Sequence, residues 1–404
     1  MALKILKTPP RYVQGPDALF QIGIQLESIG VSNPLVVASP SAMTACRDAI
    51  ASSLTAKNMA CTFTEFNRIS SMKEIHRIRD LCLDENHDAI IACGGGAAMD
   101  AGRAAAGAEG VTVAPYTFHE KFGAGVPCIQ VPTVAASDAA TAASSVIYSD
   151  DGLWENFVMF QKNPDLILAD TQVIARAPVR TLVAGMGDAI ATCFETEVSQ
   201  RTATPTFAGG MATMTALHLA RLTFEILTTY GPQAIVEAEA KIPGPALEAV
   251  VEANILLSGL GYENGGLAAA HALATAFSRQ QGIFKPMPYH GEVVAFCTLA
   301  QLIMEETDPE KLQEVYYFNQ AVGLPTSFEE LGLGGVSEDA LTAVAEETAR
   351  SLLMLSMPKA NPATDGEGRF YDVNEILIAL KLADQYSQLG TDEHQCNCDK
   401  DDHH

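Results

Sequence analysis

The sequence predicts two domains: an α/β domain over residues 1–178 and an all-helical domain over residues 179–390. Three observations support this fold class. Short hydrophobic strands alternate with helical stretches up to about residue 170, which is typical of a largely parallel sheet. After Pro178 the strand patterns give way to long segments rich in Ala and Leu. The length of 404 residues is sufficient for two hydrophobic cores.

Short apolar runs bounded by polar or turn-forming residues predict the strands of the first domain. These strands cover residues 34–39, 61–66, 88–93, 128–132 and 163–170. Between them, amphipathic patterns predict helices over about 43–57 and 72–86. An Asp-Asp-Gly turn within SVIYSDDGLWENFVMF predicts two further strands that form a hairpin.

The second domain is predicted to be helical throughout. The expected helices cover residues 179–200, 205–229, 245–278, 290–306, 309–321, 337–356 and 372–388. The last residues, 391–404, form a polar tail for which we expect disorder.

Composition excludes several classes of protein. The net charge of −24 argues against a nucleic-acid partner, because binding to phosphates needs a basic face. We expect no membrane association, since no stretch approaches the ~20 apolar residues that span a bilayer and the N-terminus lacks a signal-peptide run. Nine dispersed cysteines favour reduced thiols and a cytoplasmic location.

A glycine loop follows the strand over residues 88–93. Gly94, Gly95 and Gly96 allow a ligand to approach the backbone, and the helix that follows offers unpaired N–H groups. The loop matches neither the G-x-G-x-x-G fingerprint nor a Walker sequence. Its position between a strand and a helix nevertheless favours a pyrophosphate site. The alternative is a turn that binds no ligand.

The stretch GMGDAIATCFETE, residues 185–197, is predicted to begin a helix, and it places Asp188 after a flexible Gly-Met-Gly. His271 lies in a very apolar helix and His290 at the entry to another. Carboxylate and imidazole ligands suit Zn²⁺ with a fourth position left open. The alternative is that each histidine is a hydrogen-bonded core residue.

Five motifs occur together in one order along the chain. They are CGGGAAMDAGRA (93–104), VPTVAASDAA (131–140), GMGDAIATCFE (185–195), GGLAAAHAL (265–273) and YHGEVVAF (289–296). The ordered set resembles the glycerol dehydrogenase branch of the iron-containing (group III) alcohol dehydrogenase superfamily, over roughly residues 10–390. The resemblance implies a Rossmann-like first domain in a dehydroquinate synthase-like fold, a cleft that holds nicotinamide and metal, and a homo-oligomer.

The resemblance also implies residue roles. Asp188, His271 and His290 match the family's metal ligands, and Thr192 stands where iron-dependent members carry a fourth ligand, histidine. This pattern favours zinc over iron. Asp138 matches the position that contacts a substrate hydroxyl, so Asp138 and His271 are the expected catalytic residues. The expected cofactor-binding residues are Ser39, Gly94, Gly95, Gly96, Ala97, Asp100, Thr133, Ser137 and Tyr148.

This sequence departs from the family pattern around the cofactor. Ala97 and Ala98 replace the usual lysine and threonine of the glycine loop, and Ser39 replaces the aspartate that binds the adenosine ribose. A carboxylate there would repel a 2′-phosphate, whereas serine would not, so NAD and NADP both remain possible. Ala140 and Ala142 replace a proline and a serine near the substrate.

The predicted function is reversible hydride transfer between a nicotinamide cofactor and a small polyol or hydroxy-carbonyl compound. An NADPH-dependent reductase of 2-oxo acids or aldehydes is the first alternative. A sugar-phosphate cyclase shares the fold but would need Lys and Arg residues that these motifs lack. A non-catalytic relative with an altered glycine loop is the third alternative.

Overall fold

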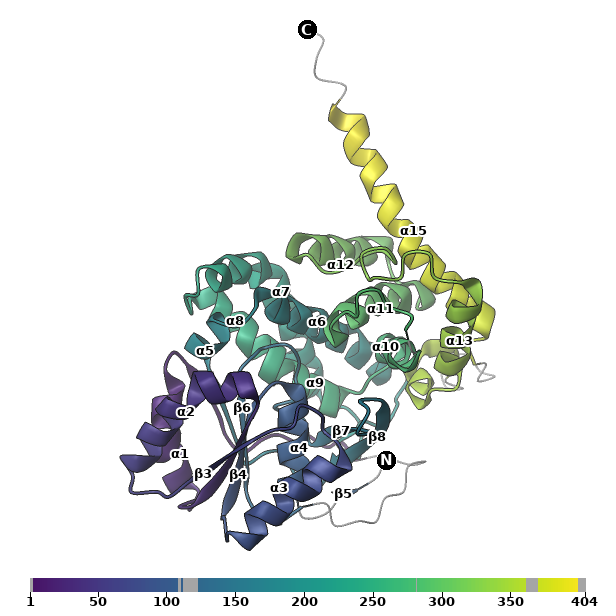
Figure 1. Ribbon diagram of the computed structural model, residues 1–404. Coiled ribbons are helices and arrows are strands. Elements are labelled where there is room, and N and C mark those ends of the chain that lie inside the picture. Colours follow the sequence, from purple (N-terminus) through teal and green to yellow (C-terminus); the bar gives the residue numbers. More distant parts are fainter. Residues whose placement is uncertain (1–2, 108–109, 112–122, 281, 361–369, 399–404) are drawn as a thin grey trace.

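The computed structural model describes residues 3–107, 110–111, 123–280, 282–360 and 370–398 (Figure 1). The strands lie in the first half of the chain and form two sheets, and the second half is helical. Figure 1 shows the helical half packed beside the sheets, with the C-terminal part of the last helix extending away from the body. No helix of the described ranges is both long enough and apolar enough to cross a membrane.

The main sheet has six strands in the order β1-β9-β6-β4-β2-β3, and every neighbouring pair is parallel. The strands are β1 (Tyr12–Gly15), β2 (Pro34–Ala38), β3 (Thr62–Glu65), β4 (Ala89–Gly94), β6 (Cys128–Pro132) and β9 (Leu166–Asp170). All the predicted parallel strands are present. The edge strand β1 was not predicted.

Helices cover both faces of this sheet. They are η1 (Ala18–Gln21), α1 (Ile22–Ser28), α2 (Pro40–Thr55), α3 (Met72–Asp84) and α4 (Gly96–Ala106). Alternate residues of one strand enter different cores: Val36 packs with α1 and α2, whereas Leu35 and Val37 pack with α3 and α4. Burial on both faces explains why the strands are continuous apolar runs.

The predicted hairpin forms a separate antiparallel sheet. It contains β7 (Ser144–Tyr148) and β8 (Trp154–Phe160), together with the short strand β5 (Gly110–Val111).

The helical half is built around a long central helix. Its elements are α5 (Thr171–Ala175), α6 (Val179–Arg201), α7 (Met214–Glu239), α8 (Pro245–Glu252), η2 (Ala253–Leu257), α9 (Ser258–Gly265), α10 (Ala269–Arg279), α11 (His290–Met304), α12 (Pro309–Val322), α13 (Glu338–Ala349), η3 (Leu352–Ser356), η4 (Pro358–Ala360) and α15 (Val373–Cys398). The last strand ends at Asp170 and α6 begins at Val179, so our division between residues 178 and 179 lies between these two elements.

Several predictions for this half differ from the structure. The segment 245–278 is interrupted by a π-helical turn, η2, and by an extended break between Gly265 and Ala269. The helix expected from residue 205 begins only at Met214. Residues 391–398, assigned to a disordered tail, continue α15, while residues 399–404 lie outside the described ranges.

The helix expected over residues 179–200 is confirmed, because α6 spans Val179–Arg201. The interpretation of residues 185–197 as the start of a helix is therefore wrong, since this stretch is the middle of α6. Gly185 and Gly187 are helical residues at close contacts. A Cβ atom on Gly185 would lie 1.9 Å from the carbonyl oxygen of Ala135, and one on Gly187 would lie 2.3 Å from that of Gly291. These glycines permit close packing rather than flexibility.

Candidate active site

The three predicted metal ligands come together from three helices. Asp188 lies in the middle of α6, His271 in the first turn of α10, and His290 at the first position of α11. Their ligand atoms all lie within 4.8 Å of one another. Asp188 Oδ1 is 3.3 Å from His271 Nε2 and 3.6 Å from His290 Nε2. Two imidazole nitrogens and one carboxylate oxygen therefore face a common point.

Among the described residues, Oδ1 of Asp188 forms ion-pair contacts with the two histidines and no hydrogen bond. The side chain is buried. Burial raises the pKa of Asp188, but the neighbouring His271 and His290 outweigh that effect and lower it. An ionised, buried oxygen without a hydrogen bond is costly unless a cation neutralises it. This oxygen and the two nitrogens fit a divalent metal ion.

A carboxylate that the sequence analysis missed supports His271. Glu195 is fully buried two helical turns after Asp188, and its Oε2 lies 2.6 Å from His271 Nδ1. Its Oε1 accepts hydrogen bonds from the backbone N–H groups of Ala268 and His271, at 2.8 and 3.0 Å. Burial lowers the pKa of His271, but Glu195 and Asp188 outweigh it and raise that pKa well above its ordinary value. Glu195 thus fixes the ring orientation, as carboxylates beside metal-binding histidines do.

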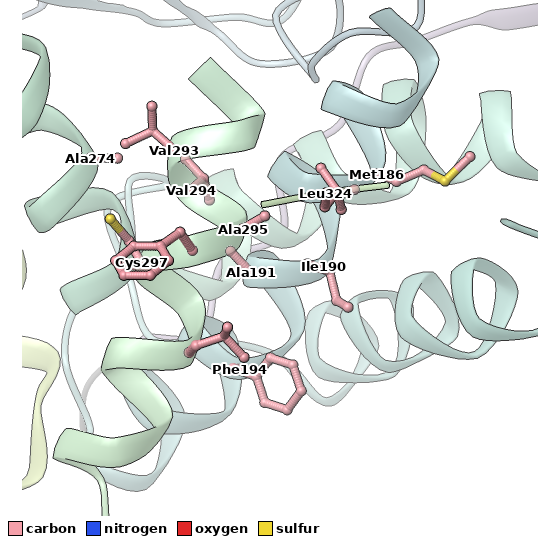
Figure 2. Close-up of a cluster of buried hydrophobic side chains, with 14 of the residues drawn as sticks. Met186, Ile190, Ala191, Phe194, Ala274, Val293, Val294, Ala295, Cys297 and Leu324 are labelled. Atoms are coloured by element: carbon pink, nitrogen blue, oxygen red, sulfur yellow. The ribbon is translucent and has the colours of Figure 1, made fainter. Parts of the chain in front are cut away.

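Small residues bring α6 and α11 into contact. Gly291 has no space for a Cβ atom, which would lie 1.8 Å from the carbonyl oxygen of Ala184. His290 precedes Gly291 and Asp188 follows Gly187, so this close approach places the two ligands side by side. Figure 2 shows apolar side chains of α6 and α11, among them Ile190 of α6 and Val294 of α11, which belong to the same hydrophobic core.

The start of α11 is fixed by a capping interaction and an ion pair. Glu292 accepts a hydrogen bond from the backbone N–H of Tyr289 at 2.7 Å. The same carboxylate binds both Nε and Nη2 of Arg180, near the start of α6, at 2.6 and 2.8 Å. Half-exposed His290 therefore projects from a helix end that is held on two sides.

Asp138 lies in the segment that follows β6 and contacts helix α9 of the helical half. Its carboxylate Oδ2 accepts a hydrogen bond of 3.1 Å from Ser258 Oγ of α9. Burial, with a further contribution from the negative charge of Asp188, raises the pKa of Asp138 to about 7. Ser258 Oγ also lies 3.1 Å from Oγ1 of Thr192, one turn after Asp188 on α6, so the segment with Asp138 packs close to the helix that carries this predicted metal ligand.

The glycine loop lies at the carboxyl ends of neighbouring parallel strands. Gly94 ends β4 with φ +155°, and a Cβ atom on it would lie 3.0 Å from Ser39 Oγ, just beyond β2. The backbone N–H of Thr133, just beyond β6, donates to the carbonyl of Gly94 at 3.0 Å. Gly95 caps α4, and a Cβ atom on Gly96 would lie 3.9 Å from Ser137 Oγ. The first N–H groups of α4 can therefore face an anion in this crevice.

The strand order changes direction at this place. From β2 the chain passes outward to β3, then returns across β2 to β4. In open α/β sheets such a switch point forms the ligand crevice. The loop thus has the position expected of a dinucleotide site, although its glycine spacing lacks the usual fingerprint.

Three further predicted cofactor residues lie on α4 and on β7 of the antiparallel sheet. Asp100 is buried in α4 and pairs with Arg103 at 3.0 Å, and Arg103 also donates to the carbonyls of Ala139 and Ser144. Burial raises the pKa of Asp100 to about 6. Tyr148 ends β7, and Ala97 lies in the first turn of α4. Through Arg103, Asp100 connects α4 to the segment that follows β6. Direct contacts of these residues with a cofactor stay predictions.

Comparison with known proteins agrees with this geometry. Residues 9–171 match the model of the family described as iron-containing alcohol dehydrogenase. Glycerol dehydrogenase from Pseudomonas putida is 38% identical over 389 residues, which cover 95% of this chain and 98% of that protein. Glycerol dehydrogenase from Thermotoga maritima is 36% identical over 388 residues, covering 94% and 97%. The chain belongs to the glycerol dehydrogenase branch of the iron-containing alcohol dehydrogenase family.

The fold comparison agrees. The crystal structure of glycerol dehydrogenase from Schizosaccharomyces pombe has a TM-score of 0.86 and 33% identity, and it covers 98% of this chain and 94% of that one. The predicted fold class and family are therefore confirmed. Membership makes the protein an alcohol or polyol dehydrogenase that uses a nicotinamide cofactor and a metal ion.

Proposed function

We propose that the protein is a zinc-dependent dehydrogenase that exchanges a hydride between NAD(P) and a small vicinal diol such as glycerol. The observation that carries this proposal is the buried Oδ1 of Asp188, which faces two imidazole Nε2 atoms without any other partner among the described residues. The relatives named glycerol dehydrogenase support the choice of a polyol.

Zinc is favoured over iron by the number and type of ligands. Two histidines and one carboxylate with an open fourth position are a common catalytic zinc set. Thr192, one turn after Asp188, stands where a fourth ligand would project. Its hydroxyl is instead 3.1 Å from Ser258 Oγ and is engaged in the protein's own hydrogen bonds.

The chain's residues hold and orient the reacting groups. Bound zinc would supply a Lewis acid that stabilises negative charge on a substrate oxygen. Asp188, His271 and His290 would hold it, and Glu195 keeps His271 in position. Asp138 would accept a hydrogen bond from a second substrate hydroxyl. Above the Asp138 pKa of about 7, a carboxylate substrate would meet the like charge of ionised Asp138, so a diol is favoured over a hydroxy acid there.

Both cofactors are compatible with the site. Ser39 lies at the end of β2 without a carboxylate, so neither NAD nor NADP is excluded by charge. Reduction of aldehydes or 2-oxo acids with NADPH on the same site is the second candidate, and Ser39 is the observation that favours it. We also propose a cytoplasmic homo-oligomer, on the basis of the dispersed cysteines and the family resemblance.

Zinc content and turnover of Asp188→Ala test the proposal. The full-length protein would be dialysed and its metals measured by mass spectrometry, beside the surface control Asp48→Ala on α2. We expect about one more zinc per chain in the wild type and the control than in Asp188→Ala, and reduction of NAD or NADP with glycerol only in the first two. An Asp188→Ala protein that keeps both its zinc and its turnover would refute the assignment.

A further inference from the structure

The helix that faces Asp138 is interrupted by a π-helical turn. This turn, η2, joins α8 to α9 without a loop. Such turns change which side chains share a helix face, and they are frequent at functional sites. Asn254 lies within the turn and Ser258 four residues later. Both side chains contact the segment that carries Asp138.

Three contacts tie this helix to the segment after β6. Asn254 Nδ2 donates to the carbonyl of Ala135 at 2.9 Å and to that of Leu182, on α6, at 3.1 Å. Thr141 Oγ1 donates to the carbonyl of Ile255 at 2.6 Å. Asn254 thus connects the Asp138 segment directly to the helix that carries Asp188. These buried hydrogen bonds hold the segment with Asp138 against the helices of the second half.

The third contact reaches Asp138 itself. Ser258, which is 1% exposed, donates to Oδ2 of Asp138 at 3.1 Å. Thr192 Oγ1 lies 3.1 Å from Ser258 Oγ. The absence of a side chain on Gly259 allows this approach, because a Cβ atom there would lie 2.6 Å from Thr141 Cβ and 3.3 Å from Asp138 Cβ. A chain of hydroxyls therefore runs from α6 to the Asp138 carboxylate.

We propose that Ser258, oriented by Thr192, is a positioning residue that gives the enzyme its selectivity for vicinal diols. Ser258 engages Oδ2 of Asp138 and thereby turns Oδ1 toward the second hydroxyl of a diol whose first hydroxyl lies at the metal site. Because Thr192 stands one turn from Asp188 on α6, the same helix sets both ends of the substrate. This inference rests on the proposed diol dehydrogenase function.

The test compares a diol with a monohydric alcohol. The values of kcat/KM for propane-1,2-diol and propan-2-ol would be measured for wild type, Ser258→Ala and Thr192→Val at a pH well above the Asp138 pKa of about 7, where this carboxylate is ionised. We expect Ser258→Ala to lower the diol value by about tenfold, as loss of a hydrogen bond to a charged group does, and to leave propan-2-ol within about twofold. Thr192→Val should give a smaller loss of the same kind. The control is Ser53→Ala, which removes a buried hydroxyl of α2 that donates to the carbonyl of Phe20.

A double-mutant cycle shows whether Ser258 acts through Asp138. In an Asp138→Ala background, adding Ser258→Ala should change the diol value by less than about twofold. A further loss there, or an equal loss for both alcohols in Ser258→Ala, would make Ser258 a general structural residue and overturn the inference. If Ser258→Ala does not fold, Thr192→Val provides the same comparison. A wild-type enzyme with no zinc at Asp188 or no diol turnover would instead refute the proposed function, and the inference with it.

Discussion

Glu195→Gln should weaken zinc binding without unfolding the protein. The glutamine keeps the shape of the side chain, and its amide oxygen can still accept from the N–H groups of Ala268 and His271. Its NH₂ group, however, replaces the oxygen that lies 2.6 Å from His271 Nδ1. When His271 binds a metal through Nε2, Nδ1 carries the proton, so two donors would face each other. The lost charge-assisted bond is worth about 1.5–3 kcal/mol, which corresponds to about 10- to 100-fold in metal affinity.

Competition with a zinc chelator would measure this effect, with the melting temperature of the metal-free protein as a second readout. Glu197→Gln is the matched control, because Glu197 lies on the same helix but points outward to Arg221, at 2.7 Å. We expect the control to bind zinc as the wild type does. Zinc affinity within about twofold of wild type in Glu195→Gln would show that Glu195 does not orient His271 for a metal.

Three further changes have expected outcomes. Gly185→Ala should lower the melting temperature. The new methyl group would clash with the carbonyl of Ala135, which costs about 1–3 kcal/mol, whereas alanine gains at most about 1 kcal/mol in helix propensity. Gly95→Ala is the stability control, because a Cβ atom there would meet nothing closer than 3.8 Å. Burial raises the pKa of Asp100 to about 6 in the folded protein, from an ordinary value of 3.8. Between these two pH values the folded state therefore binds more protons than the unfolded state. The unfolding free energy of metal-free wild type should therefore fall as pH rises through this range, and urea titrations of Asp100→Asn should show a flatter slope. Ser39→Asp keeps a side-chain oxygen that can cap the N-terminus of α2. It should lower the value of kcat/KM for NADP relative to that for NAD at least about tenfold. An unchanged ratio would place Ser39 away from the adenosine ribose.

The parallel strands could be predicted because burial on both faces leaves a simple signal, a short and continuous apolar run. β1 lacks that signal. Its sequence YVQG contains one aliphatic residue, and the four residues become a strand only by pairing with β9 at the sheet edge. The break between α9 and α10 was missed for a related reason. Residues 245–278 are apolar enough to be helical throughout, but the backbone leaves the helical region at Gly266, with φ +96°, and at Ala268, with φ −145°.

The candidate metal ligands could be predicted from motifs, but their convergence could not be derived from the residues alone. Asp188, His271 and His290 lie on three helices. They come together because Gly187 and Gly291 have no side chains and so allow the helix backbones to approach closely. Glu195 could have been found, because it follows Asp188 by seven residues and so lies on the same helix face. Ser258 had no such signal, since a serine in an apolar helix has many possible partners.

The stretch GMGDAIATCFE therefore combines packing and chemistry on one helix. Gly185 contacts the backbone of Ala135, in the segment that leads to Asp138, and Gly187 contacts the backbone of Gly291, next to His290. Asp188 follows Gly187 directly, and its Oδ1 lies 3.6 Å from His290 Nε2. A side chain at either glycine would push apart elements that carry site residues. Substitutions of Gly185 or Gly187 should therefore impair stability and metal binding together. Changes at Glu195 should separate the two, since its removal alters the orientation of His271 while the helix contacts stay in place. Comparing the two kinds of variant by melting temperature and zinc affinity would distinguish residues that assemble the site from one that tunes it. Equal losses of stability in both would contradict this division.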